Sequence, residues 1–549
     1  MNNKQHFNHG DTAEGRRFNG TMSYLPQGNF GWLYRNLPAW KPELDAEAEL
    51  ENLAQEMKGT NRCDGSLAAG YTYFAQLVDH DLTFDPSSLS QQIDDPEILH
   101  HYRTPAFDLD CIYGRGPRVD PHLYSEREPE RLRLTKTPSG EWDLPRFDND
   151  RAIVADARND DLILLSQLHV GISRFHNQLV EILLERREFK NSPASRERST
   201  AVFLEARRLV RWHYQWVVLH DFLPKLLHPK VKDRLFDKVL SRLKRPDQAP
   251  LLHYRPETSA YLPIEFTAAA FRFAHCLPRA SYQLNPSLTR EMPESATLFR
   301  NDLDPMDQAG LSTGSTNGMK RLKRILGEVE AGNIPIFTNT EPIQLPSGRR
   351  ARMLGNLHPD LRGRRKLPPN WGVDWSLFLA PLGAQSSSQV QRAMSIEPKF
   401  SLPLFEIPVG PSTESLASLD LKKGYRYALP SGQTLARRMG LDSEDLLTLK
   451  DFDHSIDGYV KQETPLLYYI LAEAKQKALG QTLGVLGSEI IGETFIGLML
   501  LDSTSYLNEN PRWTPNARSE YCLLDLLRLE IDEAAIDQLN LVPMARYHR

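Results

Sequence analysis

Apolar residues recur at helical spacing over long stretches of the chain, whereas strand-like alternation is scarce. This spacing gives a helix one apolar face that can pack on its neighbours. The stretches are 66–82, 158–186, 199–227, 264–277, 464–478 and 484–501. The pattern predicts a mainly α protein with few and short strands.

Long connections rich in proline and glycine separate these stretches, at 104–150, 278–320 and 337–370. Loops of this length inside a compact protein tend to be functional. Residues 1–60 show no sustained periodicity but contain many aromatic residues, which argue against disorder. We therefore expect an irregular N-terminal arm, 1–60, packed on one body, 61–549.

The composition is that of an ordinary globular protein, with 549 residues, 40% hydrophobic residues and a formal net charge of -5. This charge argues against general nucleic-acid binding, and the basic stretch 346–371 is better explained as a solvated loop than as an anion-docking surface. The cysteines match no disulfide or zinc spacing, so a reducing compartment is the default. The N-terminus lacks a hydrophobic signal region, and no apolar run is long enough to span a bilayer. We expect a cytoplasmic protein, or one exported without a classical signal peptide.

The stretch GYTYFAQLVDHDLTFDP, residues 70–86, combines polar groups with an apolar helix. Gln76 and His80 lie four residues apart, so they share one helix face, whereas Asp79 and Asp81 project to either side of His80. Burying charges without partners costs several kcal/mol. The simpler interpretation is a helix end with a core histidine, but the number of polar side chains favours a metal or cofactor.

A second motif, RTPAFDLDCIYGRGP, holds oxygen ligands in a loop. Thr104, Asp108 and Asp110 are evenly spaced, and with one carboxylate from elsewhere they would suit Ca²⁺, which binds six to eight oxygens. Asp81 could be that carboxylate. A turn with exposed acidic residues remains the alternative for this motif taken alone.

Two further motifs contain candidate polar residues. Arg158 and Asp161 lie three residues apart on one face at a helix start, where first-turn capping is the alternative role. Arg272 precedes His275 by about one turn, and small alanines before His275 leave room for a flat group.

Together these motifs resemble the animal-type haem peroxidases of the peroxidase-cyclooxygenase superfamily. The ordered matches are QLVDHDLTF, TPAFDLDCIYG, ARNDD with RFHNQL, FRFAHCL and LASLDLKKGYRYALPSGQ, within about residues 65–505. Among the members of this superfamily, the sequence most resembles the bacterial single-domain proteins. The resemblance implies a helical fold around a buried haem, with 61–549 as the haem peroxidase catalytic domain.

The resemblance also implies roles for individual residues. His80 matches the distal histidine, Arg158 the distal arginine, and Gln76 the glutamine that binds pocket water and halide. His275 matches the histidine that ligates the haem iron, and Arg272 an arginine that meets a haem propionate. The implied activity is reduction of hydrogen peroxide, a response to oxidative stress, with oxidation of an organic or halide donor.

Other matched positions concern haem attachment and calcium. Asp79 matches an aspartate that can form an ester with haem b, Asp161 replaces the glutamate of a second ester, and Asp420 replaces the asparagine that holds the iron-ligating histidine. The implied calcium ligands are Asp81, Thr104, Asp108 and Asp110 through side chains and Ala106 through its carbonyl.

Two other activities stay open at this point. A fatty-acid dioxygenase of the same superfamily is the main alternative. A metal-dependent phosphohydrolase built on the pair His80 and Asp81 is more remote, since a suitable upstream histidine is missing and the calcium-like loop is left unexplained.

Overall fold

The structure is a computed structural model. It describes residues 28–42, 45–59, 63–84, 100–190, 193–240, 251–257, 259–288, 333–337, 343–344, 350–351, 360–382, 389–405, 407, 415–448, 451–452, 463–517 and 520–538.

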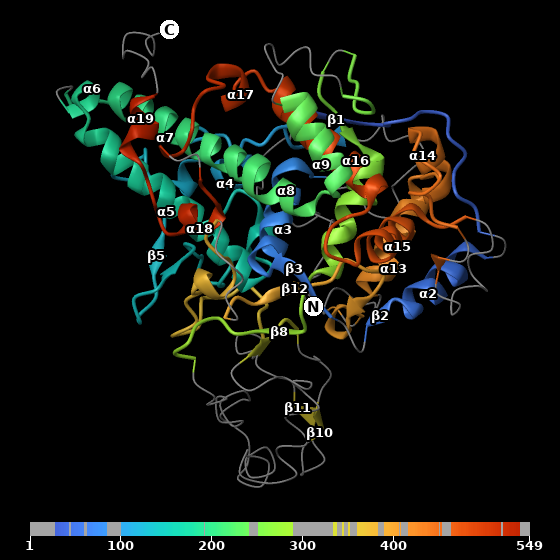
Figure 1. Ribbon diagram of the computed structural model, residues 1–549. Helices are drawn as coiled ribbons and strands as arrows, with labels where there is room; N and C mark the ends of the chain where they lie inside the picture. Colours follow the sequence, from blue (N-terminus) through green and yellow to red (C-terminus); the bar gives the residue numbers. More distant parts are fainter. Residues whose placement is uncertain are drawn as a thin grey trace.

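Helices make up most of the regular structure in the described residues, which confirms the predicted mainly α class (Figure 1). The α-helices are α2 Ala46–Glu56, α3 Gly70–Leu82, α4 Asp110–Tyr113, α5 Ile163–Glu185, α6 Arg187–Lys190, α7 Arg196–Trp216, α8 Leu223–Leu226, α9 Pro229–Asp233, α10 Ile264–Thr267, α13 Leu416–Arg426, α14 Gly432–Met439, α15 Leu466–Ala478, α16 Val485–Leu501, α17 Tyr506–Glu509, α18 Leu523–Leu527 and α19 Glu533–Asp537. Segments of 3₁₀ helix are Pro121–Leu123, Ala157–Asp160, Ala270–Cys276, Trp375–Leu377 and Leu402–Phe405, and π-helix occurs at Val217–Phe222 and Arg234–Val239.

The strands are short and form small, separate sheets. They are β1 Gly28–Gly31, β2 Lys58–Gly59, β3 Asp64–Ala68, β4 His100–His101, β5 Thr135–Lys136, β6 Trp142–Asp143, β7 Leu262–Pro263, β8 Ser281–Tyr282, β9 Ile334–Pro335, β10 Ile343–Gln344, β11 Arg350–Ala351, β12 Arg392–Met394 and β13 Phe400–Ser401. Strand β1 pairs antiparallel with β4 and parallel with β7, and the other described strands form pairs, such as antiparallel β3 with β12.

The helices predicted at 66–82 and at 264–277 differ from the observed elements. The helix expected from residue 66 begins at Gly70, because the preceding residues form β3 and pair with β12. The backbone of Gly70 donates a hydrogen bond to Phe378, and a Cβ at this position would lie 2.7 Å from the side chain of Leu379. The stretch 264–277 divides into α10 and a 3₁₀ helix, since Ala269 (φ −139°, ψ −68°) breaks the helical path. Tertiary packing thus decides both boundaries.

The predicted N-terminal arm is more regular than expected where it is described. Residues 46–56 form α2, which begins with an Asp45 side chain that accepts a hydrogen bond from the amide of Glu47. This helix packs against α13. The boundary of the arm at residue 60 stays a prediction.

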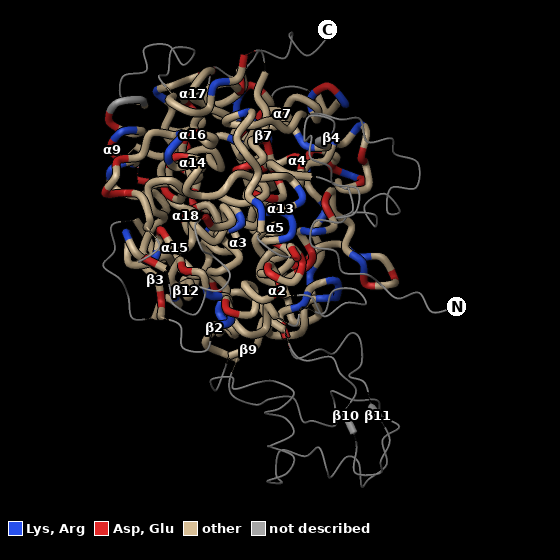
Figure 2. The backbone as a smooth tube through the Cα atoms, turned by 90° about the vertical axis from the view of Figure 1, so that its right-hand side faces the viewer, with Lys and Arg blue, Asp and Glu red and all other residues tan. Residues whose placement is uncertain are grey.

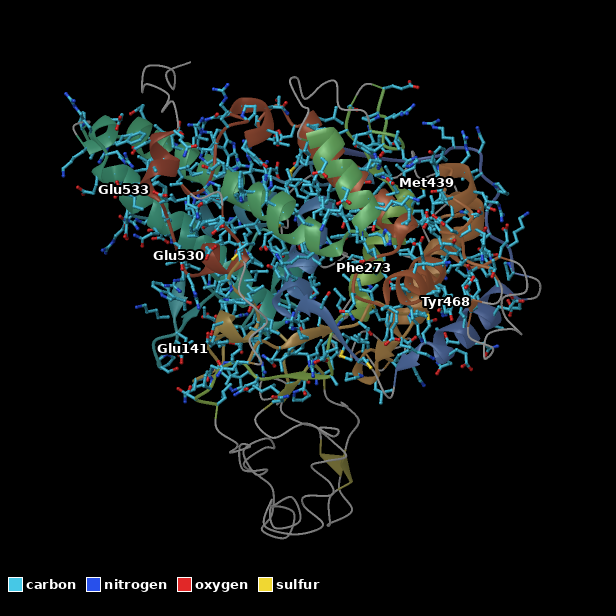
Figure 3. The ribbon with its side chains drawn as sticks, viewed as in Figure 1. Glu141, Phe273, Met439, Tyr468, Glu530 and Glu533 are labelled. Atoms are coloured by element: carbon cyan, nitrogen blue, oxygen red, sulfur yellow. The ribbon has the colours of Figure 1, made fainter. Side chains whose placement is uncertain are left out.

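Helix α3 runs through the middle of the molecule (Figure 1). It packs on α5 and on the 3₁₀ helix Ala270–Cys276, and nearly all of its residues are buried. Phe273 of that 3₁₀ helix is fully buried, and Figure 3 shows it near the centre of the fold. The central apolar core therefore surrounds the two segments that carry His80 and His275.

Charged residues of both signs are interspersed along the chain (Figure 2). Among the described residues, no helix has both the length and the apolar character required to cross a bilayer.

Candidate functional site

A cavity lies between parts of α3 and of the 3₁₀ helix Ala270–Cys276, and sequence-predicted residues from distant parts of the chain line it. The polar lining includes Gln76, Asp79, Asp161, Arg272 and His275. The apolar lining includes Phe271, Pro278, Ile336, Phe337, Leu404 and Leu416. The chain thus brings one imidazole, two carboxylates and a guanidinium to a mostly apolar space, which fits the donor set and apolar walls that a haem requires.

A hydroxyl group in the cavity wall supports the presence of a ligand. Thr72 and Tyr73 lie on α3 and are 5% and 1% exposed. The hydroxyl of Thr72 has no hydrogen-bond partner among the described residues, and that of Tyr73 faces the hydroxyl of Tyr282. Buried polar groups are normally paired, so the Thr72 hydroxyl fits a cavity that holds a polar or amphipathic group.

Helix geometry separates the two aspartates that flank His80, as the sequence predicted. Asp79 lines the cavity, on the side that also carries Gln76. Asp81 is fully buried on another side of α3, where its carboxylate approaches Asp108 and Asp110. Helix α3 therefore faces the cavity on one side and the carboxylate cluster on another.

His80 is 1% exposed and is held by a side chain that the sequence analysis did not assign to the site. Its Nδ1 lies 2.9 Å from Oδ1 of Asn159. Burial, together with the charge of Arg158, lowers the pKa of His80 to about 4. The imidazole is therefore neutral at physiological pH, as a proton-accepting group requires.

Arg158 is buried beside His80 and is held by Asp156, a second residue that the sequence analysis missed. The Nε and Nη2 atoms of Arg158 donate to the Asp156 carboxylate, and Nη2 also donates to the carbonyls of His80 (3.1 Å) and Thr83 (2.7 Å). Neither His80 nor Arg158 lines the cavity itself. The one signal for Asp156 was its place two residues before Arg158, where it caps the 3₁₀ helix Ala157–Asp160.

His275 lies across the cavity from α3 and pairs with Asp420 of α13. The distance between His275 Nδ1 and Asp420 Oδ2 is 2.6 Å. The neighbouring lysines contact other groups, since Lys422 lies 3.7 Å from Glu51 and Lys423 lies over the ring of Tyr427. The carboxylate of Asp420 is thus directed at the histidine.

The two carboxylates in the cavity wall have opposite pKa shifts. Burial opposes the ionisation of Asp79, but the charges of Arg272 and Arg158 outweigh it and lower the pKa to about 2. Burial raises the pKa of Asp161 to about 6, although Arg364 lies 3.0 Å away and opposes that shift. Asp79 is therefore the more readily ionised of the two.

A second cluster contains the carboxylates of Asp81, Asp108 and Asp110, each of which offers an oxygen within 4.8 Å of the others. Both oxygens of the fully buried Asp81 lack hydrogen-bond partners among the described residues. Burial and the two neighbouring carboxylates raise the pKa of Asp81 well above its usual range. Three largely buried carboxylates this close together fit a bound cation.

The loop before this cluster brings the other predicted ligands near. The hydroxyl of Thr104 donates to Asp108 at 3.0 Å, and the amide of Asp110 donates to the same carboxylate at 3.1 Å. Ala106 lies between them in a turn closed by its own amide and the carbonyl of Thr104. Asp110 does not continue the extended loop that was expected, because α4 starts at this residue after Leu109 adopts a positive φ of 58°.

Comparison with known proteins gives matches over part of the sequence. Residues 100–333 match the family model described as animal haem peroxidase. Peroxidase mlt-7 of Caenorhabditis elegans is 30% identical over 199 residues, which are 34% of this chain and 24% of that protein. A peroxidase-like protein of Margaritifera margaritifera is 25% identical over 245 residues, 42% of this chain and 28% of that protein. The matched regions therefore span about a quarter of the length of these relatives.

Comparison of folds gives matches over nearly the whole chain. Peroxidase A from Dictyostelium discoideum has a TM-score of 0.54 at 15% identity and covers 94% of this chain and 95% of its own. The fatty acid alpha-dioxygenase of Oryza sativa has a TM-score of 0.52 at 13% identity and covers 93% of this chain and 82% of its own. Both similarities concern the fold.

Proposed function

We propose that this chain is a haem peroxidase of the animal-type superfamily, which reduces hydrogen peroxide and oxidises a small organic or halide donor; the match of residues 100–333 to the animal haem peroxidase family model supports this proposal. The observation that carries this proposal is the placement of His275 with its Asp420 partner on one side of the cavity and of α3, with Gln76 and Asp79, on the other. In this proposal His275 ligates the iron of haem b, and Arg272 binds a propionate.

Bound haem supplies the redox chemistry that cleaves peroxide, and the chain supplies the proton transfers. His80 would accept a proton from one peroxide oxygen and return it to the other, which requires a neutral imidazole. Its pKa of about 4 meets this requirement. Gln76, one helical turn earlier on the same face, orients water or halide.

Arg158 would stabilise the negative charge that develops on the leaving oxygen, because a guanidinium stays charged in a buried site. Asp156 and two carbonyl groups engage its Nε and Nη2. No described residue accepts a hydrogen bond from its Nη1, which therefore remains able to donate to a ligand.

Asp81, Thr104, Asp108 and Asp110, with the carbonyl of Ala106, form the proposed Ca²⁺ site. The unpartnered oxygens of Asp81 support this assignment. Because Asp81 follows His80 directly, a cation there would restrain the histidine, as outer groups commonly do around catalytic centres.

Asp79 is the proposed attachment point for an ester to haem. It lines the cavity and is ionised. Asp161 is engaged by Arg364 and has a shorter side chain than the glutamate used elsewhere in the superfamily, so we propose no second ester there.

Fatty-acid dioxygenation is the second candidate activity, favoured by the apolar cavity walls and the fold shared with a plant dioxygenase. The phosphohydrolase reading is disfavoured, because His80 contacts Asn159 whereas Asp81 approaches Asp108 and Asp110. His80 and Asp81 therefore do not approach one common metal position.

The test is a set of assays on the haem-loaded protein with bromide, iodide, phenols and fatty acids. We expect peroxide-dependent oxidation of halide or phenol that falls at least about tenfold in His80→Ala, in line with general acid–base catalysis. Oxygen consumption with fatty acids, without turnover of any peroxide-dependent donor, would instead assign the dioxygenase activity.

A further inference from the structure

The contacts of Asn159 fix how its amide group is oriented. Asn159 is fully buried at the end of the 3₁₀ helix Ala157–Asp160. Its Nδ2 lies 3.0 Å from the carbonyl oxygen of Cys111 and 3.2 Å from Nδ1 of His169, and its Oδ1 lies 2.9 Å from Nδ1 of His80. The amide therefore touches one carbonyl and two imidazoles.

A carbonyl oxygen can only accept a hydrogen bond. The side of the amide that faces Cys111 must therefore be the NH₂ group, and the reverse orientation would place two oxygens against each other. It follows that the oxygen of Asn159 faces His80. An amide oxygen also only accepts, so the proton of a neutral His80 must reside on Nδ1.

We propose that Asn159 is a positioning residue that holds His80 as the Nδ1–H tautomer and so leaves its Nε2 unprotonated, as the proton acceptor for peroxide. This inference rests on the proposed peroxidase function for its catalytic meaning, although the tautomer itself does not. The same amide donates to Nδ1 of His169, so His169 carries its own proton on the opposite nitrogen, Nε2. The structure thus assigns opposite tautomers to the two histidines that contact one amide.

The first test reads the tautomers directly by ¹⁵N NMR of imidazole nitrogens, which separates protonated from unprotonated ring nitrogens. The sample is the haem-loaded protein in its diamagnetic ferrous carbon monoxide form at about pH 8, where an imidazole with an ordinary pKa of about 6.5 is neutral. His80→Gln and His169→Gln identify the two signals by their loss. We expect Nδ1–H for His80 and Nε2–H for His169, and Nε2–H for His80 would overturn the proposal.

The second test uses two substitutions that separate the acceptor of Asn159 from its donors. Asn159→Ala removes both, whereas Asn159→Asp keeps an oxygen towards His80 but cannot donate to Cys111 or His169. We expect Asn159→Ala to lose the uniform Nδ1–H tautomer and to slow the reaction with peroxide at least about tenfold. Asn159→Asp should keep the tautomer and lose less rate than Asn159→Ala.

Asn177→Ala is the matched control, since both ends of the Asn177 amide in α5 form hydrogen bonds with the backbone of Leu132 rather than with a histidine ring. This control should leave the His80 tautomer unchanged. An unchanged tautomer in Asn159→Ala, or an equal rate loss in Asn159→Asp and Asn159→Ala, would show a merely structural role. Assigned tautomers in a protein that does not react with peroxide would instead refute the proposed function and leave the amide orientation standing.

Discussion

Asp156 holds two buried arginines, and its substitution should disturb both the stability of the protein and its reaction with peroxide. The Asp156 carboxylate lies 2.5 Å from Arg103 and 2.7 Å from Arg158. Arg103 also lies 3.3 Å from Asp110 of the carboxylate cluster. A continuous chain of charges therefore connects the proposed calcium site with the arginine beside His80.

The expected magnitude follows from burial. The side chain of Asp156 is 1% exposed, and those of Arg103 and Arg158 are 9% and 8% exposed. Removing one partner of a buried ion pair costs about 3–5 kcal/mol, since the remaining charge stays buried without its counterion. In Asp156→Asn, Arg103 would keep Asp110, but Arg158 would keep only carbonyl oxygens. We expect a loss of about 3 kcal/mol in the free energy of unfolding.

Urea denaturation of the unmodified protein and of Asp156→Asn measures this loss in the free energy of unfolding. The control is Asp442→Asn, which breaks a surface pair with Lys230 whose side chains are 63% and 49% exposed, and it should cost about 0–1 kcal/mol. Stopped-flow mixing with peroxide should show a slower reaction in Asp156→Asn alone, because Arg158 is no longer held. A loss equal to that of the control, with an unchanged rate, would refute the proposed role of this network.

Three further outcomes test other parts of the structure. Asp420→Asn should raise the Fe(III)/Fe(II) potential by roughly tens of millivolts, because a neutral amide pulls the proton of His275 less strongly than a carboxylate does; a spectroelectrochemical titration without a rise would count against the pairing. Removal of calcium by a strong chelator should lower the melting temperature, and metal analysis should find the ion in the untreated protein. Burial raises the pKa of Glu473 to about 8, so the folded state keeps a proton that the unfolded state loses above about pH 4.3. The free energy of unfolding should therefore fall as the pH rises from about 4.3 to about 8. Glu473→Gln should flatten that slope, whereas an unchanged slope would show that another group causes it.

The sequence predicted those features that depend on helix periodicity. The four-residue spacing of Gln76 and His80 and the opposite projection of Asp79 and Asp81 follow from the geometry of one helix. The structure shows the same separation of Asp79 from Asp81.

The side chains that hold the catalytic pair could not be predicted in the same way. Asn159 contacts His80 across 79 positions of sequence, and this contact depends on how the 3₁₀ helix packs against α3. From sequence, Asp156 and Asn159 resemble ordinary helix-start residues, because asparagine and aspartate favour such positions for local reasons. Their roles became visible only once the two segments were packed together.

The family resemblance implied His275 as the partner of Asp420, although Lys422 and Lys423 lie nearer to the carboxylate in sequence. The structure favours His275, since Lys422 contacts Glu51 of α2 and Lys423 lies over the ring of Tyr427. A choice between near and distant partners of this kind requires the tertiary fold.

The most direct test of the central claim is a stopped-flow absorption measurement on the haem-loaded protein mixed with hydrogen peroxide. The account predicts a Soret band that is lost in His275→Ala, and a rapid peroxide-dependent spectral change that slows at least about tenfold in His80→Ala. A purified protein that takes up no haem, or one whose spectrum changes equally fast with and without His80, would contradict it.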